Sequence, residues 1–455
     1  MLLARVRPSA PVRVRALAKP PERDASGIAA LYRLEQEGLL HHVTPLGRAA
    51  RREVSGKGRS GQVAAALLAA AREHDAARAE TGYVLIHLKN PAHRTALLRK
   101  LAADRDLVSV SRVAARYIWA ASNPAGGFLP PERMWNHARI QLAAARKLPA
   151  YHPPGNIRVA VLDSGVQIRH PSLKGRVHDY VHSFGRGHRV KSSAKDIVGH
   201  GTHIAGILNA SREDTLGIEG IAHCRLTVMK VFDDRLDADP AARARIFLVN
   251  PLLYHWALDE CLARRFDVVN LSLGGPAPPD PHEAAVLKAL LARGTTIVAA
   301  MGNALKHRTR PVYPAASPGV IAVGAVGPDD VVTPFSCRGR HIALCAPGVA
   351  IWSTLPTFPG EFGFLGEARA GERRSRARPL ARNTRYDAWP GTSGACPHVT
   401  AAVAILLASK GPMSPARVKQ RLMRAADRVT GMHGKRFDPK YGAGRLNLRR
   451  LLENP

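Results

Sequence analysis

Continuous apolar segments alternate with segments of helical spacing from residue 157 onward. The apolar segments are short and rich in β-branched residues, which is typical of strands buried on both faces. We expect strands at 157–162, 226–232, 268–273, 296–300 and 320–326. We expect helices at 203–209, 252–264, 281–292 and 398–408. This alternation predicts an α/β fold, a doubly wound parallel sheet whose ligands bind beyond the carboxyl ends of the strands.

A weaker version of this pattern precedes the main domain. Residues 83–88 have the composition of a strand, residues 91–103 have helical spacing, and residues 107–113 alternate as a strand does. They predict a β-α-β unit over 83–113, within a small α+β module of ferredoxin-like type that spans 1–118. A fainter copy of the unit is expected upstream, with extended segments at 12–17 and 39–43 around a helix at 28–37.

Residues 119–133 are rich in Pro, Gly and small side chains, and we expect them to form a linker. The linker divides the chain into the module 1–118 and a larger domain, 134–455. Within that domain, residues 356–390 combine Gly and Pro with seven arginines and are expected to form a basic surface loop, an insertion that lies just before Ser393 in the sequence.

Composition excludes some classes of protein. Hydrophobic residues make up 45% of the 455 residues, enough for a sizeable core, and no run approaches the ~18 apolar residues of a membrane-spanning helix. We therefore expect no membrane partner. The start of the chain lacks the apolar core of a secretory signal, and five scattered cysteines without a C-x-x-C pair suit a reducing compartment. A cytoplasmic location is expected, or secretion if the true start differs.

The net charge of +32 is the strongest compositional feature. It has two interpretations, a generally solvated basic surface or a face that binds polyanions. Because the basic residues are spread along the chain rather than clustered, the first is favoured, and nucleic acid is not expected as a partner.

Three polar side chains stand at the ends of predicted elements. Asp163 ends the strand 157–162, His200 lies between two glycines where a helix begins, and Ser393 lies at the entry to the helix 398–408. Pro397 is expected in the first turn of that helix, where its missing N–H costs nothing. A serine hydroxyl becomes a nucleophile when a neutral histidine takes its proton, and a carboxylate can orient that histidine. Together these residues predict acyl transfer.

Asn303 follows the strand 296–300, at the same edge of the predicted sheet. Its side-chain amide could donate to the oxyanion that develops in acyl transfer, beside the backbone N–H of Ser393. A lone Asp at a strand end or a lone Ser at a helix start is usually a turn or cap residue. The coincidence of all four groups argues against that explanation here.

These segments resemble, in the same order, the catalytic motifs of the subtilisin-like serine proteases (subtilases, peptidase family S8), and the similarity runs over 134–455. The resemblance implies a serine endopeptidase with Asp163 as orienting acid, His200 as general base, Ser393 as nucleophile and Asn303 in the oxyanion hole. Its substrates would be proteins or peptides. It also implies that Ser272, Leu273 and Gly274 belong to the segment that lines the specificity pocket and pairs with the substrate backbone.

The same resemblance extends to other segments and shows some departures. The module at 1–118 is similar to a subtilase propeptide, which implies intramolecular inhibition. Ser172 stands where many relatives carry a calcium-ligating Asp, so we expect no tight metal site there and no cofactor. Gly394 replaces a Met and Cys396 a Ser. We expect Cys396, His203 and His398 to be structural.

Alternatives remain open from the sequence alone. The chain could be a basic scaffold protein on a subtilase fold that docks nucleic acid or an acidic partner. It could also be an enzyme kept latent by its N-terminal module or by the arginine-rich loop at 356–390. The side-chain specificity, the physiological substrate and the site of maturation are not encoded in readable motifs.

Overall fold

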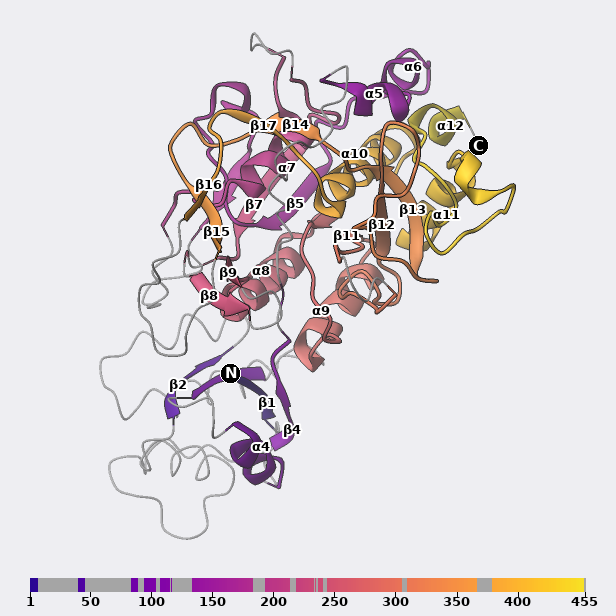
Figure 1. Ribbon diagram of the computed structural model, residues 1–455. Coiled ribbons are helices and arrows are strands. Elements are labelled where there is room, and N and C mark those ends of the chain that lie inside the picture. Colours follow the sequence, from indigo (N-terminus) through magenta and orange to yellow (C-terminus); the bar gives the residue numbers. More distant parts are fainter. Residues whose placement is uncertain are drawn as a thin grey trace, which may run out of the picture.

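A seven-stranded parallel sheet forms the centre of the main domain, in the order β13-β12-β11-β10-β5-β7-β6 (Figure 1). Its strands are β5 (Arg158–Asp163), β6 (Asp179–Val181), β7 (Arg225–Lys230), β10 (Val268–Leu271), β11 (Thr296–Ala300), β12 (Ile321–Val326) and β13 (Ile342–Pro347). All five predicted strands are confirmed, and β6 and β13 add to them. The computed structural model describes residues 1–6, 40–45, 83–88, 94–103, 107–114, 116, 133–182, 193–212, 218–232, 234, 236–239, 244–304, 309–365 and 379–453.

Helices cover both faces of this sheet, as predicted. The face with the first buried cluster carries α7 (His200–Asn209), α10 (Thr392–Lys410), α11 (Pro415–Ala425), α12 (Leu448–Glu453), α5 (Trp135–Arg139) and α6 (Leu142–Arg146). The opposite face carries α8 (Pro251–Arg264) and α9 (Pro281–Ala292). Short 3₁₀ helices lie at Pro171–Leu173 and Thr430–Met432.

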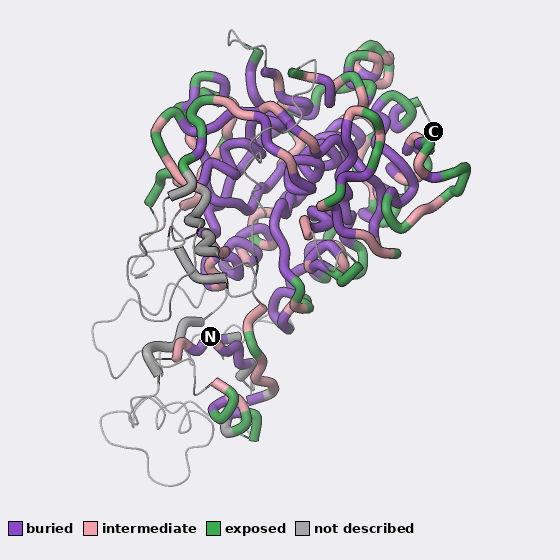
Figure 2. The backbone as a smooth tube through the Cα atoms, in the orientation of Figure 1, coloured by how far each residue is buried: buried purple, intermediate pink, exposed green. Residues whose placement is uncertain are grey.

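The side chains of β5 alternate between the two helix layers that cover the sheet. Val159 and Val161 belong to the buried cluster that includes α7 and α10, whereas Ala160 and Leu162 belong to the cluster that includes α8 and α9. Every second side chain of a strand points to the same face, so a strand covered on both sides must be apolar throughout. The interior of the domain is accordingly buried along nearly its whole length (Figure 2).

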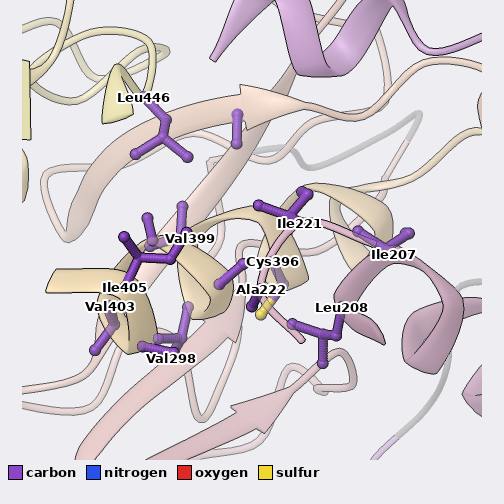
Figure 3. Close-up of a cluster of buried hydrophobic side chains, with 14 of the residues drawn as sticks. Ile207, Leu208, Ile221, Ala222, Val298, Cys396, Val399, Val403, Ile405 and Leu446 are labelled. Carbon is purple, nitrogen blue, oxygen red and sulfur yellow. The ribbon is translucent and has the colours of Figure 1, made fainter. Parts of the chain in front are cut away.

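Helix α10 is the central helix of the core, and Val399, Val403 and Ile405 of this helix pack close to Val298 of β11 (Figure 3). It is the one described helix long and apolar enough to cross a membrane, but 89% of that window is buried inside the fold. The predicted start at residue 398 was too late. α10 begins at Thr392, so Pro397 lies inside the helix rather than in its first turn.

Four strands and a helix are described in the N-terminal module. They are β1 (Leu2–Val6), β2 (Leu40–Pro45), β3 (Tyr83–Leu88), α4 (Arg94–Ala102) and β4 (Leu107–Arg112), and the sheet order is β2-β3-β1-β4. β3, α4 and β4 lie within the predicted β-α-β unit at 83–113, and β2 overlaps the extended segment expected at 39–43. β1 was not predicted, and it lies between β3 and β4, antiparallel to both. The predicted segments 12–17 and 28–37 and the linker residues 119–132 lie outside the described residues.

The expectation of a loop at 356–390 is wrong for its described residues. β15 (Glu361–Leu365) and β16 (Pro379–Ala381) join β9 (Ala244–Phe247) and β8 (Leu236–Asp239) in a second sheet. β17 (Tyr386–Trp389) pairs with β14 (Ile351–Thr354). The Gly, Pro and Arg content suggested a loop, whereas the alternating aromatic residues near 361–365 fit a strand. Residues 366–378, with five of the arginines, lie outside the described residues.

Candidate active site

Asp163 and His200 are in direct contact at the carboxyl end of the sheet. The Nδ1 atom of His200 lies 2.8 Å from Oδ1 and 3.0 Å from Oδ2 of Asp163. Both side chains are buried, with 1% and 0% of their surfaces exposed. Because Nδ1 faces a carboxylate, it is the nitrogen that carries the proton, and a neutral imidazole then has its lone pair at Nε2. The geometry therefore presents a base at Nε2.

This base is not satisfied inside the fold. Among the described residues, Nε2 of His200 is buried without a hydrogen-bond partner. The hydroxyl of Ser393 is thus not hydrogen-bonded to it in this structure, as is common in enzymes without substrate. A buried, unpaired nitrogen is costly for a purely structural histidine, which indicates that Nε2 serves a reacting group.

The sequence around His200 brings the two residues together. His200 is the first residue of α7, and β5 ends at Asp163. Gly201 allows the close approach, because a Cβ built there would lie 2.0 Å from the carbonyl oxygen of Gly165 and 3.1 Å from Cβ of Asp163. Only glycine fits between the helix and the strand end.

A second buried carboxylate, Asp196, supports the start of α7. It accepts hydrogen bonds from the backbone N–H groups of Gly199, at 2.8 Å, and Thr202, at 2.9 Å. The hydroxyl of Ser164 also donates to it, at 2.8 Å, and in turn accepts from the N–H of Gly201, at 2.9 Å. Sequence reasoning missed Asp196, although an acidic residue just before a helix is a known capping signal.

Ser393 is the second residue of α10. Its backbone N–H lies in the first turn, where the helix offers no acceptor and the macrodipole favours negative charge. The preceding Gly391 has a φ of 153°, a conformation that residues with a Cβ rarely adopt. The hydroxyl of Ser272 donates to the Ser393 carbonyl at 2.9 Å.

Asn303 lies beside this helix start and is held by it. Its Oδ1 accepts from the N–H of Thr392 at 2.9 Å and from the hydroxyl of Thr392 at 2.8 Å. The hydroxyl of Thr392 also accepts from the N–H of Gly302 at 3.1 Å. With Oδ1 fixed on this side, Nδ2 is the end of the amide that faces away from Thr392, the orientation an oxyanion donor requires.

The predicted substrate-binding residues Ser272, Leu273 and Gly274 directly follow β10, and all three are buried. Just beyond them, Gly275 and Tyr313 form an antiparallel bridge, with both N–H···O distances at 2.8 Å. In the strand order, β5 and β10 are neighbours. β6 and β7, which follow β5 in the chain, lie on one side of this pair, and β11, β12 and β13, which follow β10, lie on the other. The strand order therefore reverses between β5 and β10, and folds of this kind bind their ligands at such a point.

Known proteins share this arrangement. The model of the subtilase family matches residues 155–444. Subtilisin E of Bacillus subtilis (strain 168) is 32% identical over 312 residues, 66% of this chain and 68% of subtilisin E. Thermitase of Thermoactinomyces vulgaris is 32% identical over 300 residues, 65% of this chain and 88% of thermitase. The chain belongs to the subtilase family. It is a serine endopeptidase, and its substrates are proteins or peptides.

Among solved structures, this subtilase is similar to fervidolysin of Fervidobacterium pennivorans, a keratinolytic enzyme related to subtilisin. The identity is 25% and the TM-score is 0.59, over 83% of this chain and 57% of fervidolysin. The chain thus spans a little over half the length of that relative. The predicted α/β fold, with its doubly wound parallel sheet, is confirmed.

Two further histidines of the subtilase are structural, as predicted. His203 stacks on Trp389 with ring centroids 4.9 Å apart, and its Nε2 lies 3.0 Å from the carbonyl oxygen of Ile351. Burial lowers the pKa of His203 to about 3, and His200 adds to this effect, so it is neutral. His398 lies between Gly394 O, 2.8 Å from its Nδ1, and Asn136 Nδ2, 2.9 Å from its Nε2.

Cys396 of the subtilase is also structural. It is fully buried, its thiol donates to Oδ1 of Asn270 at 3.2 Å, and burial raises its pKa to about 12. A thiol with such a pKa is protonated and unreactive at neutral pH. Together with Ser272 and Thr400, it connects α10 to β10 through the side chain of Asn270.

Proposed function

We propose that this subtilase cleaves peptide bonds through an acyl-enzyme formed on Ser393. The hydroxyl oxygen attacks the scissile carbonyl carbon while Nε2 of His200 accepts its proton. The oxyanion of the tetrahedral intermediate is held by Nδ2 of Asn303 and the N–H of Ser393. When the C–N bond breaks, His200 returns the proton to the leaving amine, and a water molecule then hydrolyses the ester by the same steps in reverse.

The observation that carries this assignment is the buried contact between Asp163 and His200 together with the unpaired Nε2. Asp163 fixes the tautomer and stabilises the imidazolium that forms when the proton moves. Ser272, Leu273 and Gly274 are assigned to the substrate backbone, because they follow β10 next to the Ser393 helix.

Labelling with a fluorophosphonate probe tests the triad. The wild-type chain should be labelled at Ser393, and Ser393→Ala should not be labelled. His200→Ala should fold but react at a rate close to that of an unactivated serine. Equal labelling of the wild type and Ser393→Ala would contradict the assignment. The scaffold alternative is not favoured, since the relatives are proteases.

We further propose that the N-terminal module restrains the catalytic domain through Arg116. Its guanidinium forms two hydrogen bonds with Glu283, at 2.6 and 3.2 Å, and one with the carbonyl of Ala277, at 2.8 Å. Its own carbonyl accepts from the N–H of Val249. Burial alone would lower the pKa of Arg116, but Glu283 outweighs it, so the pKa is raised.

Three other observations support contact between the module and the catalytic domain. Leu3 and Leu85 belong to the same buried cluster as Trp256 of α8. In Figure 1 the module lies on the side of the domain that carries α8 and α9. The similarity to fervidolysin covers 83% of the chain, which is more than the catalytic domain alone.

The full-length Arg116→Ala variant tests this restraint. Its initial rate on a chromogenic peptide, measured before any self-cleavage, should exceed that of the wild type several-fold. Arg112→Ala is the matched control, because Arg112 is exposed and its side chain donates to Thr95, within its own module. Equal initial rates for all three proteins would show that Arg116 exerts no restraint.

We also propose that the subtilase needs no calcium at the position of Ser172. The Ser172 hydroxyl lies 2.8 Å from that of Tyr386, so it is engaged inside the fold. The described residues contain no cluster of carboxylate and imidazole groups with the arrangement of a metal site. Residues 213–217, which carry two carboxylates in the sequence, lie outside the described part of the chain. A reducing, cytoplasmic location is proposed from five cysteines that are all buried and free.

A further inference from the structure

One buried arginine joins the inserted segment to the active site. Arg382 follows β16, and only 5% of its surface is exposed. Its guanidinium donates to the backbone carbonyls of Ile197 at 2.9 Å, Pro356 at 3.2 Å, Asn383 at 3.0 Å and Phe358 at 3.0 Å. The planar, five-donor guanidinium can serve such a set of carbonyls, whereas the three donors of a lysine cannot.

The charged group of Arg382 lies beside the turn that precedes His200, because a Cβ built on Gly199 would lie 3.0 Å from its Nε. Among the described residues, all of its hydrogen-bond acceptors are carbonyl oxygens. Burial therefore lowers its pKa, and the carboxylate of Asp196 opposes that effect. Burying a cation without a bonded carboxylate is costly, and such an arrangement persists where its contacts serve a purpose.

Ile197, the first acceptor, belongs to the turn that carries His200 into α7. From inside the fold, Asp196 fixes this turn through the N–H groups of Gly199 and Thr202. On the side of the inserted segment, Arg382 holds the same turn by donating to the carbonyl of Ile197. The orientation of the His200 ring depends on this turn, since His200 is the first residue of the helix that follows.

The inserted segment at 356–390 packs tightly against the turn at 196–199. A Cβ built on Gly360 would lie 2.2 Å from the carbonyl oxygen of Ile197 and 2.6 Å from Nε of Arg382. The insertion also contacts the segment after Asp163, because Thr357 and Gln167 exchange two hydrogen bonds, at 2.7 and 2.8 Å. The inserted segment therefore touches the residues that follow the acid and those that precede the base.

We propose that Arg382 is a positioning residue for peptide-bond hydrolysis. It holds the turn 196–199, and through it the imidazole of His200, in the orientation that aims Nε2 at the Ser393 hydroxyl. This inference rests on the triad proposed above. It assigns the insertion a role in catalysis that is separate from substrate binding, so kcat rather than KM should respond.

The test compares Arg382→Ala with the wild type as full-length proteins on a chromogenic peptide. Rates are normalised to the serine titrated by a fluorophosphonate. We expect kcat to fall about tenfold to a hundredfold, the scale of a misplacement of about 1 Å, with KM within about threefold of the wild type. Guanidinium chloride at concentrations well below denaturing should restore part of kcat in this variant, and urea at equal concentration should not.

Two further variants separate positioning from general stability. Arg385→Ala removes the same charge from the same segment, but Arg385 is exposed and its side chain makes no hydrogen bond among the described contacts. It should retain wild-type kcat. Gly360→Ala should lower kcat by pressing on Ile197, without rescue by guanidinium. If Arg382→Ala does not fold, Arg382→Lys is measured in the same way, with an intermediate loss expected.

A wild-type kcat in Arg382→Ala, or in Arg382→Lys if only that variant folds, would overturn the proposal. So would a loss of melting temperature with kcat per titrated serine unchanged, or an equal loss of kcat in Arg385→Ala. These results are distinguishable from failure of the triad, because Ser393→Ala reports on the triad by itself. Activity in Ser393→Ala would contradict the proposed function whatever Arg382 does.

Discussion

The hydroxyl of Ser272 donates a hydrogen bond to the backbone carbonyl of Ser393, at 2.9 Å. In a regular α-helix that carbonyl would accept from the N–H four residues later, but this position is Pro397, which has no N–H. Ser272, next to β10, thus supplies the missing donor. The proline inside α10 is tolerated because a side chain from the substrate-binding segment replaces the bond it removes.

Ser272→Ala should therefore impair both folding and catalysis. It leaves a buried carbonyl without a donor, which costs about 1–3 kcal/mol of unfolding free energy. It should also lower kcat several-fold, since the nucleophile is less well held. Ser317→Ala is a suitable control, because the buried Ser317 hydroxyl has no hydrogen-bond partner among the described residues. Urea unfolding and peptide kinetics measure both effects, and equal behaviour of the two variants would contradict the explanation.

Asn303→Ala should lower kcat by about 10²–10³-fold with little change in KM, the magnitude known for loss of the oxyanion donor in a subtilisin. The Oδ1 contacts with Thr392 are lost as well, so unfolding must be followed in parallel. Asn303→Asp keeps the acceptor atom for Thr392 but removes the Nδ2 donor. It should be as inactive as Asn303→Ala while being more stable, and an active Asp variant would contradict the role.

Substitution by alanine should change the stability of the enzyme in opposite directions at two glycines of the active site. Gly201→Ala places a Cβ 2.0 Å from the carbonyl of Gly165, so α7 must move away from Asp163. We expect a loss of several kcal/mol of stability and of most of the activity. Thermal melting and peptide hydrolysis measure these losses, and wild-type values for both would contradict the close approach.

At Gly394 the same substitution should stabilise the enzyme. A Cβ there would meet only Ile351, at 3.6 and 3.9 Å, which are ordinary contacts. Gly394 lies in α10 and is not among the residues with positive φ, so alanine should add roughly 0.5–1 kcal/mol through its helix propensity. The melting temperature should rise by a few degrees. A fall would show that the first turn of α10 needs the conformational freedom of glycine at this position.

A buried histidine pair at the α8–α9 contact gives stability a pH dependence. Nδ1 atoms of His255 and His282 lie 2.8 Å apart, and Nε2 of His255 lies 3.1 Å from Asp280. Burial alone would lower the pKa of His255, but Asp280 outweighs it and raises the pKa. Burial alone would raise the pKa of Asp280, but His255 outweighs it and lowers the pKa.

The sign of the effect follows from these directions. His255 stabilises the fold fully below about pH 6.5, and this contribution is lost as the pH rises through its raised folded pKa. Asp280 stabilises the fold above about pH 4, and this stabilisation is lost as the pH falls through its lowered folded pKa. Urea unfolding of His255→Gln should therefore show the greatest deficit between these values and a smaller one at alkaline pH. His152 is exposed, so His152→Gln should show no stability deficit at any of these pH values. A deficit of His255→Gln that does not change with pH would contradict the role of the histidine pair.

Calcium should have little influence on the melting temperature. Ser172 offers a single engaged hydroxyl where a calcium site needs several oxygens. Melting curves with excess calcium and with a chelator should agree within about one degree. A rise with calcium that a chelator reverses would contradict this prediction.

The sequence predicted the parts of the site that depend on local signals. Asp163 at a strand end, His200 at a helix start and Asn303 after a strand were identifiable because the hydrophobic pattern places those ends at one edge of the sheet. Asp196 was missed, although its spacing from the helix start fits a cap. The bond from Ser272 to Ser393 was not predictable, because it joins residues 121 positions apart.

The errors at the other elements have physical causes. α10 begins six residues earlier than expected because Ser272 compensates for Pro397, which sequence reasoning treats as a first-turn residue. β15 was missed because its partner β9 lies far away in the chain, and β17 because it pairs with β14, on the other side of the segment 355–385. Strand pairing at long range overrides local composition.

The position of β1 constrains the order in which the chain can assemble. Leu2–Val6 pairs with β3, which ends at Leu88, and with β4, which ends at Arg112, so the pairing of β1 is complete only when residue 112 has been made. From that point the described sheet of the module can close, before Asp163, His200 or Ser393 exists. During synthesis, the segment that bears Arg116 is thus in place before the nucleophile that it is proposed to restrain.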